Sequence, residues 1–528
     1  MARKSRNPPA RRLAPVPPPA IEAEQQATRR WLGIALAGAA VLAFFTLLRL
    51  LGPHPWDYDE YYHVWLAREM RGGMPTGFPW TPFSTMHEHF SDPVPLFHLV
   101  LLPFAGFALN QATLAGAFIG QLLVVTALGW VLGAHRVPYA PLWLLGLAGL
   151  GTDLVTRLAM CRPHHGEIAF TILFVGLLLL DAPVWALGVV AAVFGLFHAS
   201  GWMPVLFVVL WLAAPESLTR VPRRRRWIGL GATAAGWIVG QLLHPRFLDN
   251  LKLLWTTNVT ILSQSAAGDS GLRSQVGNEL QPLSGDLLLE QWPALLAAGA
   301  LVWLLATRRK WRRREVIAVG FLALAFLLPG IVLWRRFFEL GAPLSLLALA
   351  LGTARRGATP DTPALSKRAI YVLATLVAAA SLYTFLTVRG TGIGTVSPPD
   401  AMARWLGEHG KPGEQVFTGN WADSAPLLYH APQLHSMVAL DPTAFWVKDP
   451  ELFALYVRII DGREARPAPL VRERFGARWV TIWKAPNLKT FATRMVKSGE
   501  ASVVFNDAYY LVLDLGPRAP AGAPATND

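Results

Sequence analysis

The first long apolar run of the chain reads WLGIALAGAAVLAFFTLLRLL and covers residues 31–51. About 20 apolar residues in a helix are needed to cross the hydrocarbon core of a bilayer. Similar runs recur as far as residue 388, and a spanning backbone has to be helical to satisfy its own hydrogen bonds. In composition 53% of the residues are hydrophobic, 16% are charged and the mean hydropathy is +0.35. These values exclude an ordinary water-soluble enzyme and predict a polytopic α-helical membrane protein.

The net charge of +14 comes from basic residues that gather in short tracts between the apolar runs. Tracts such as residues 223–226 and 308–314 are typical of cytoplasmic loops, where Lys and Arg concentrate. The charge therefore reports topology and argues against nucleic-acid binding. Residues 1–30 are basic and rich in proline, and we expect a disordered cytoplasmic tail there. The one cysteine, Cys161, cannot form a disulfide within the chain.

The number of crossings follows from treating each basic tract as cytoplasmic. This count predicts about 11 transmembrane helices, or up to about 13 if short segments also cross. Residues 94–109 are short and contain Pro103, so we expect them to lie along the membrane surface or to re-enter. The N-terminus is then cytoplasmic and the C-terminal part extracytoplasmic. The expected spans cover residues 31–51, 112–132, 141–158, 168–180, 184–197, 202–213, 227–243, 292–306, 316–334, 341–351 and 370–388.

Residues 389–515 have a mixed composition that predicts a C-terminal extracytoplasmic α/β domain. Two of its β-rich patches are separated by Asn506 and Asp507, a pair typical of a hairpin turn. Residues 516–528 are expected to form a second disordered tail. The expected strands cover residues 415–418, 479–483, 502–505 and 509–513, and the expected helices cover residues 399–409, 450–460 and 488–497.

The loop after the first span opens with WDYDEYYH and carries Asp57, Asp59, Glu60 and His63. If a helix starts near Asp59, then Asp59 and His63 share one of its faces. A carboxylate there can take a proton from a hydroxyl nucleophile or hold a divalent cation. The alternative is that Asp57 and Asp59 only cap the helix that follows. Three acids in four residues exceed what a cap requires, so we favour a functional role.

Two further polar clusters stand at predicted outer ends of helices. The first joins Arg162 to two histidines, and its donors suit an anionic head group because Arg binds phosphate bidentately. Its alternative is that Asp153 and Arg157, four residues apart, neutralise each other. The second holds two arginines against the positive-inside trend and suits a lipid phosphate; its alternative is pairing with Glu339 or with lipid head groups. The clusters comprise Asp153, Arg157, Arg162, His164, His165 and Glu167, and then Arg335, Arg336 and Glu339.

Four local features occur together in this chain: Asp59-Glu60 after the first span, DPVPL at residues 92–96, Arg162, and RFFE at residues 336–339. With them the chain resembles the GT-C class of polyprenyl-phosphate-sugar glycosyltransferases. The nearest resemblance is to the bacterial protein-mannosyltransferase-like group, which includes aminoarabinose transferases. The outer domain also resembles domains appended to members of this group, through GEQVF at residues 413–417, LDPT at residues 440–443 and FGARW at residues 475–479.

The resemblance implies a GT-C-like module over residues 31–388 in the bacterial inner membrane. It implies an inverting transfer of a sugar from a polyprenyl-phosphate donor to a hydroxyl acceptor at the outer face, with Asp59 as general base assisted by Glu60 and His63. Relatives divide on metal dependence; a divalent cation, Mg²⁺ or Mn²⁺, would bind Asp59 and Glu60. The phosphate-binding residues would be Arg162, His164, His165, Arg335 and Arg336, and further candidates are Asp57, Asp92, Asp153, Glu167 and Glu339.

Two other classes of function share parts of this pattern. A transporter or lipid flippase also has many helices, but it predicts ionisable residues near the middle of spans. Here most predicted span centres are apolar, and the acids gather in outer loops. A non-catalytic envelope assembly protein would use the outer domain alone, and Asp59 would then only cap a helix.

Overall fold

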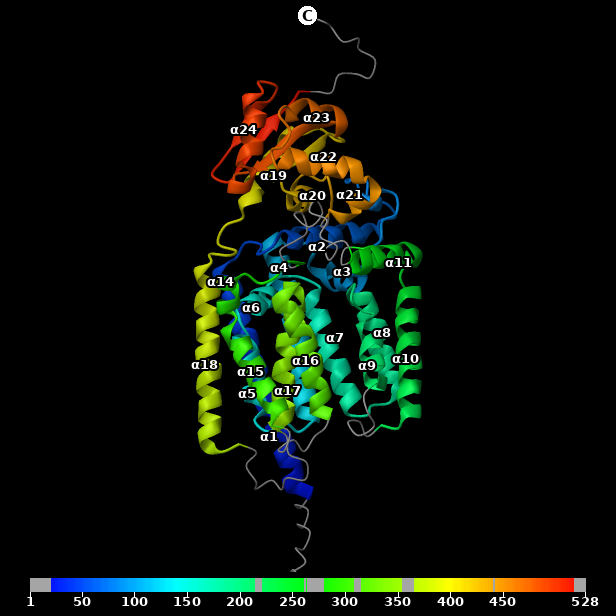
Figure 1. Cartoon of the computed structure of the whole chain (residues 1–528), viewed down its shortest axis with the longest axis vertical. Helices are drawn as coiled ribbons and strands as arrows, with labels where there is room; N and C mark the ends of the chain where they lie inside the picture. Colours follow the sequence, from blue (N-terminus) through cyan, green and yellow to red (C-terminus); the bar gives the residue numbers. More distant parts are fainter. Residues whose placement is uncertain are drawn as a thin grey trace, which may run out of the picture.

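A computed structural model describes residues 20–213, 221–260, 263, 280–307, 315–353, 365–439 and 442–516 of the chain. Its helices stand side by side in a bundle, and a C-terminal domain covers one end (Figure 1). The first helix, α1 (Ala20–Leu51), begins at the opposite end of the bundle. Residues 20–30 are therefore helical, which corrects the expected tail, because Ala, Glu and Gln there are strong helix formers. The expected tails at residues 1–19 and 517–528, and the tract at residues 308–314, lie outside the described residues.

The bundle consists of helices that match most of the expected spans. Among the described residues, four helices are long and apolar enough to cross a membrane, and a bent pair is a fifth candidate. The four are α1, α4 (Leu109–Ala134), the segment Arg335–Thr353 that ends in α17 (Phe338–Thr353), and α18 (Lys367–Gly390). The other main helices of the bundle, most of them shorter, are α7 (His164–Leu179), α8 (Val184–Phe197), α9 (Met203–Ala213), α10 (Arg223–Leu242), α15 (Trp292–Ala306) and α16 (Glu315–Val332).

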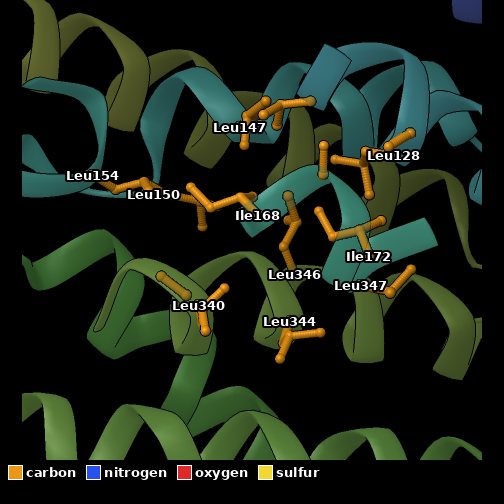
Figure 2. Packing of buried hydrophobic residues seen from close by; sticks show 14 of the residues in the cluster. Leu128, Leu147, Leu150, Leu154, Ile168, Ile172, Leu340, Leu344, Leu346 and Leu347 are labelled. Carbon is orange, nitrogen blue, oxygen red and sulfur yellow. The ribbon is translucent and has the colours of Figure 1, made fainter. Parts of the chain in front are cut away.

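The centre of the bundle is a cluster of buried aliphatic side chains from several helices (Figure 2). Ile168 and Ile172 lie one turn apart on α7, which contacts both α4 and α17. Leu128 of α4 and Leu346 of α17 belong to the same buried cluster. Because lipid tails are as apolar as leucine, close packing of this kind holds the helices together.

One expected span is bent rather than straight. Residues 141–158 form α5 (Ala140–Leu145), a short turn and then α6 (Thr152–Ala159), with a bend of 91° between the two parts. Gly151 lies at the break with φ +106°, a conformation that favours glycine. The expectation of one continuous helix is wrong here, and α6 leads directly to the turn that holds Arg162.

Short helices lie between the bundle and the C-terminal domain (Figure 1). Residues 94–109 include α3 (Pro95–Leu101), whose seven residues are too short to cross a bilayer. The expectation that residues 94–109 do not span stays a prediction, which the length of this helix supports. The other helices of this layer are α2 (Tyr58–Glu69), α11 (Phe247–Trp255) and α14 (Gly285–Glu290).

The C-terminal domain is an α/β module with a four-stranded sheet in the order β1-β2-β4-β3. β1 and β2 are parallel, and β3 and β4 form the antiparallel hairpin that was expected around residues 506–507. All four expected strands and all three expected helices are confirmed. The elements are α19 (Pro398–His409), β1 (Gln415–Thr418), α20 (Ser424–His430), α21 (Thr443–Lys448), α22 (Pro450–Ile460), α23 (Pro467–Arg474), β2 (Ala477–Trp483), α24 (Lys489–Lys497), β3 (Ser502–Asn506) and β4 (Tyr510–Asp514).

The C-terminal domain shares an apolar core with α2, which carries the acid-rich sequence. Tyr62 and Trp65 of α2 are buried in one cluster with Ala425 and Leu428 of α20. This contact fixes the domain directly over the start of α2.

Candidate active site

Asp57 and Asp59 at the start of α2 both face one arginine. Asp57 takes the N-cap position, but its side chain makes no capping hydrogen bond. Instead, Asp57 and Asp59 each form an ion pair with Arg162, which lies in the turn between α6 and α7. The capping alternative therefore does not describe Asp57. The fold therefore joins the acid-rich loop after α1 and the cluster around Arg162 into one site.

Asp59 is the more accessible of the two carboxylates. Its side chain is 25% exposed, against 18% for Asp57 and 13% for Arg162. Counted on these three groups alone, the cluster has one negative charge in excess. An accessible carboxylate can accept a hydrogen bond from a hydroxyl group and take up its proton.

Glu60 does not take part in this cluster. Its side chain is fully buried, and its two oxygens accept from Arg49 at 2.7 Å, from the amide of Trp56 at 2.9 Å and from the amide of Cys161 at 2.6 Å. These contacts fasten the end of α1, the first loop and the α6–α7 turn to one carboxylate. The arrangement assigns Glu60 a structural role, whereas the sequence reasoning grouped it with Asp59.

Glu60→Ala is expected to destabilise the protein strongly, because it leaves Arg49 buried without its carboxylate. The loss of one partner of a buried ion pair costs about 3–5 kcal/mol. Thermal unfolding of the purified protein in detergent measures the change. Glu69→Ala, at an exposed position of the same helix, is the control and should leave the midpoint unchanged. Equal midpoints for both variants would contradict the structural role.

His63 ends a buried chain of hydrogen bonds that begins at Asp92. Asp92 Oδ2 lies 2.6 Å from His98 Nδ1, and His98 Nε2 lies 2.8 Å from His63 Nδ1. Asp92 is itself held by the amide of Val94 at 3.0 Å and, through its carbonyl, by His244 at 2.7 Å. The sequence reasoning missed His98, although a histidine within an otherwise apolar helix was a usable signal.

These hydrogen bonds fix which nitrogen of His63 carries the proton when the imidazoles of His63 and His98 are both neutral. The Asp92 carboxylate only accepts, so His98 donates through Nδ1 and accepts through Nε2. His63 then donates through Nδ1, and the lone pair is on Nε2. Burial, followed by the nearby His98, Arg162 and His198, holds the pKa of His63 well below its usual range, so His63 is neutral.

His164 and His165 differ in their surroundings. His165 faces two backbone carbonyls, at 2.7 Å from Arg162 and 2.9 Å from Leu158, and so shapes the α6–α7 turn. His164 is buried, and neither of its ring nitrogens has a hydrogen-bond partner among the described residues. Leaving buried polar atoms unpaired is costly, so His164 is a candidate for contact with a polar ligand.

The remaining charges form ion pairs between helices. Arg335 pairs with Asp153, and Arg157 pairs with Glu339 at 2.8 Å. Asp153 and Arg157 thus each have an ion-pair partner on another element, and Glu339 is the partner of Arg157. The next links are Arg336 to His198 at 3.5 Å and His198 to Glu167 at 3.7 Å.

The residues proposed for a divalent cation do not fit one in this arrangement. Asp57 and Asp59 face the guanidinium of Arg162, and Glu60 is committed to Arg49 and two amides. Among the described residues, no group of three or more His, Cys, Asp or Glu side chains has the arrangement of a metal site.

The structure therefore gathers some of the candidate residues and separates others. Asp59, Asp57 and Arg162 are in direct contact, and Arg162 and His198 act electrostatically on His63 and His164. Glu60, His165 and Arg335 are tied to other partners. The site thus combines an accessible carboxylate with Arg162 and a buried His164 whose ring nitrogens have no partner among the described residues.

The whole arrangement has the GT-C fold, and the likeness to one solved structure extends over the C-terminal domain as well as the bundle. Among solved structures, the chain is similar to the oligosaccharyltransferase of Archaeoglobus fulgidus in the apo form, with a TM-score of 0.58 and 14% identity over 84% of this chain and 69% of that one. It is also similar to ArnT of Cupriavidus metallidurans bound to undecaprenyl phosphate, with a TM-score of 0.54 and 15% identity over 92% of this chain and 98% of that one. ArnT in the apo state gives a TM-score of 0.52 at 15% identity.

No family model and no curated protein sequence matches the chain. At this level of identity the likeness to solved structures establishes the fold, and the function has to be argued from the site.

Proposed function

We propose that the protein is an inverting glycosyltransferase that moves a sugar from a polyprenyl phosphate to a hydroxyl acceptor at the outer face of the bacterial inner membrane. The observation that carries the proposal is the contact of Asp59 with Arg162 beside the unpartnered, buried His164. A base for the acceptor and donors for a phosphate are thereby held side by side. The undecaprenyl phosphate in the ArnT structure supports the choice of lipid.

In the proposed reaction Asp59 takes the proton of the acceptor hydroxyl as its oxygen attacks the anomeric carbon of the sugar. The bond from that carbon to the phosphate oxygen breaks, and its electron pair stays on the phosphate. A single displacement of this kind inverts the anomeric centre. The polyprenyl phosphate leaves with one more negative charge than the donor had.

The positive charge and the donors around Asp59 would stabilise that leaving group. Arg162 is the first candidate because its planar fork suits phosphate, and His164 supplies ring nitrogens without other partners. Arg336 reaches the same region through His198. Preorganised donors around developing charge are usually the largest single contribution to catalysis. Arg335 and His165 have structural partners, so we place them behind the site.

The test is a transfer assay with purified protein in liposomes. Labelled polyprenyl-phosphate sugars are supplied together with candidate hydroxyl acceptors, and both the labelled product and the free polyprenyl phosphate are measured. One mole of polyprenyl phosphate released for each mole of sugar transferred supports the proposal. Movement of intact donor across the bilayer without bond cleavage would favour a flippase. If neither sugar transfer nor donor movement occurs, the result would favour an assembly role.

A further inference from the structure

One face of α2 is fastened to the C-terminal domain, and it is opposite the face that carries Asp59. The helical positions 58, 61 and 68 fall within one stripe, whereas Asp59 and His63 project from the other side. The bonded atoms lie 3.2 Å apart for Tyr58 and Tyr510, 2.6 Å for Tyr61 and Asp400, and 2.6 Å for Arg68 and Tyr429.

The contact at Tyr58 continues into the domain. The Tyr510 hydroxyl donates to Asp423 Oδ1 at 2.7 Å, and both of these side chains are fully buried. Asp423 also receives weaker hydrogen bonds from Asn420 at 3.3 Å and Thr481 at 3.5 Å. A continuous chain therefore runs from the sheet of the domain to the residue that stands between Asp57 and Asp59.

We propose that Tyr510 and Asp423 are positioning residues for the transfer reaction, through their hydrogen-bonded chain to Tyr58. This inference rests on the proposed glycosyltransferase function. The C-terminal domain thereby sets the register of the first turn of α2. Tyr510 and Asp423 touch neither substrate; they act by fixing the backbone on both sides of Tyr58.

Small displacements at this point have large effects on a reaction. Catalytic groups must be held within fractions of an ångström, and a shift of about 1 Å can cost roughly 100-fold in rate. Asp57 and Asp59 are covalently adjacent to Tyr58, so a change at its hydroxyl reaches both acids. The apolar contact of α2 with α20 is separate from this chain, so the domain stays docked when one hydroxyl is removed.

The experiment compares Tyr510→Phe, Tyr58→Phe and the double variant with wild type in the transfer assay. Each single change removes one hydroxyl group, and we expect kcat to fall about tenfold, which is near the effect of losing one hydrogen bond. The KM for the donor should stay unchanged, because Arg162 and His164 are untouched. The double variant should be no worse than either single variant, since both break the same chain.

Tyr456→Phe is the matched control. Its hydroxyl is buried in the same domain and close enough to Asp423 to interact electrostatically with it, but it donates its hydrogen bond to the carbonyl of Thr418 at 3.0 Å. We expect wild-type kcat for this variant. A loss in Tyr510→Phe no greater than in Tyr456→Phe, or losses that multiply in the double variant, would overturn the proposal.

A second measurement needs no substrate. Amide hydrogen exchange of residues 57–62 should be faster in Tyr510→Phe than in wild type, and unchanged in Tyr456→Phe. If exchange is faster in Tyr510→Phe but the wild-type protein transfers no sugar, Tyr510 still positions α2 and the proposed glycosyltransferase function is rejected. Unchanged exchange in Tyr510→Phe would reject the positioning role alone.

Asp423 provides a pH signature. Burial raises the pKa of Asp423 to about 7, although hydrogen bonds from Tyr510, Thr481 and Asn420 oppose the shift, and the phenols of Tyr58 and Tyr456 also face this carboxylate. An aspartate in an unfolded chain titrates near pH ~4. Between these values the folded domain holds a proton that the unfolded chain lacks. Its stabilising effect is complete below about pH 4 and is lost as the pH rises through about 7.

Asp423→Asn keeps the shape and removes the titration. As the pH is raised from 5 to 8, the thermal unfolding midpoint of wild type should fall relative to that of Asp423→Asn. The ratio of the two kcat values should also change, with a midpoint near pH 7, if the chain positions the acids. A ratio that stays constant with pH would mean that Asp423 does not act on the site.

Discussion

Asp59→Asn is expected to lower kcat by about 10²–10⁴, the range that a positioned general base contributes. Asparagine has the same shape but cannot take the proton of the acceptor hydroxyl. Donor binding should be retained, because the basic groups that would hold the phosphate are unchanged and one nearby negative charge is lost. Single-turnover transfer and direct binding of polyprenyl phosphate, measured on the same preparation, separate the two effects.

Asp57→Asn is the control for this result, since it removes an equal charge from the same arginine. We expect a loss of about tenfold or less, as for a group that only helps to orient Arg162. Equal losses in the two variants would mean that the pair acts through Arg162 and that Asp59 is not the base.

Arg162→Gln is expected to have the second large effect, about 10²–10³ on kcat, as for removal of one donor to developing charge. Unlike Asp59→Asn, it should also weaken the binding of polyprenyl phosphate. Arg162→Lys keeps the charge but loses the planar fork, so part of the binding and little of the rate should return. Isothermal titration with polyprenyl phosphate and the transfer assay provide the two numbers.

Normal lipid binding by Arg162→Gln would show that the phosphate is held elsewhere. Arg225→Gln is a suitable comparison, because Arg225 pairs with an exposed carboxylate, Asp181, near the start of α10. That variant should transfer sugar at the wild-type rate.

Long apolar runs were sufficient to predict most helices of the bundle. The β-rich patches and the turn residues between them were sufficient to predict all four strands of the C-terminal domain. The failure at residues 141–158 has a local cause. Apolar composition does not distinguish a straight span from a bent one, and the glycines at 146, 149 and 151 were the available sign of a break, which the structure places at Gly151 with its positive φ. Arg162, which pairs with Asp59, follows directly after the bent segment.

The site was predictable in residue type but not in pairing. Asp59 and Glu60 are neighbours with similar chemistry, and the fold alone decides that one is accessible and the other fully buried on Arg49. Ion pairs between distant helices, such as Arg335 with Asp153, leave no local trace in the sequence. Tyr58 gave no signal either, since its partner Tyr510 is 452 residues away.

That separation has a consequence for biosynthesis. Tyr510 opens β4 of the C-terminal domain, so the contact with Tyr58 cannot form until residue 510 has left the ribosome and this strand has reached the same side of the membrane as α2. The helix α2 is synthesised early, and Tyr58 has no contact with Tyr510 until β4 is made. The nascent protein should therefore lack this positioning contact until β4 has been made.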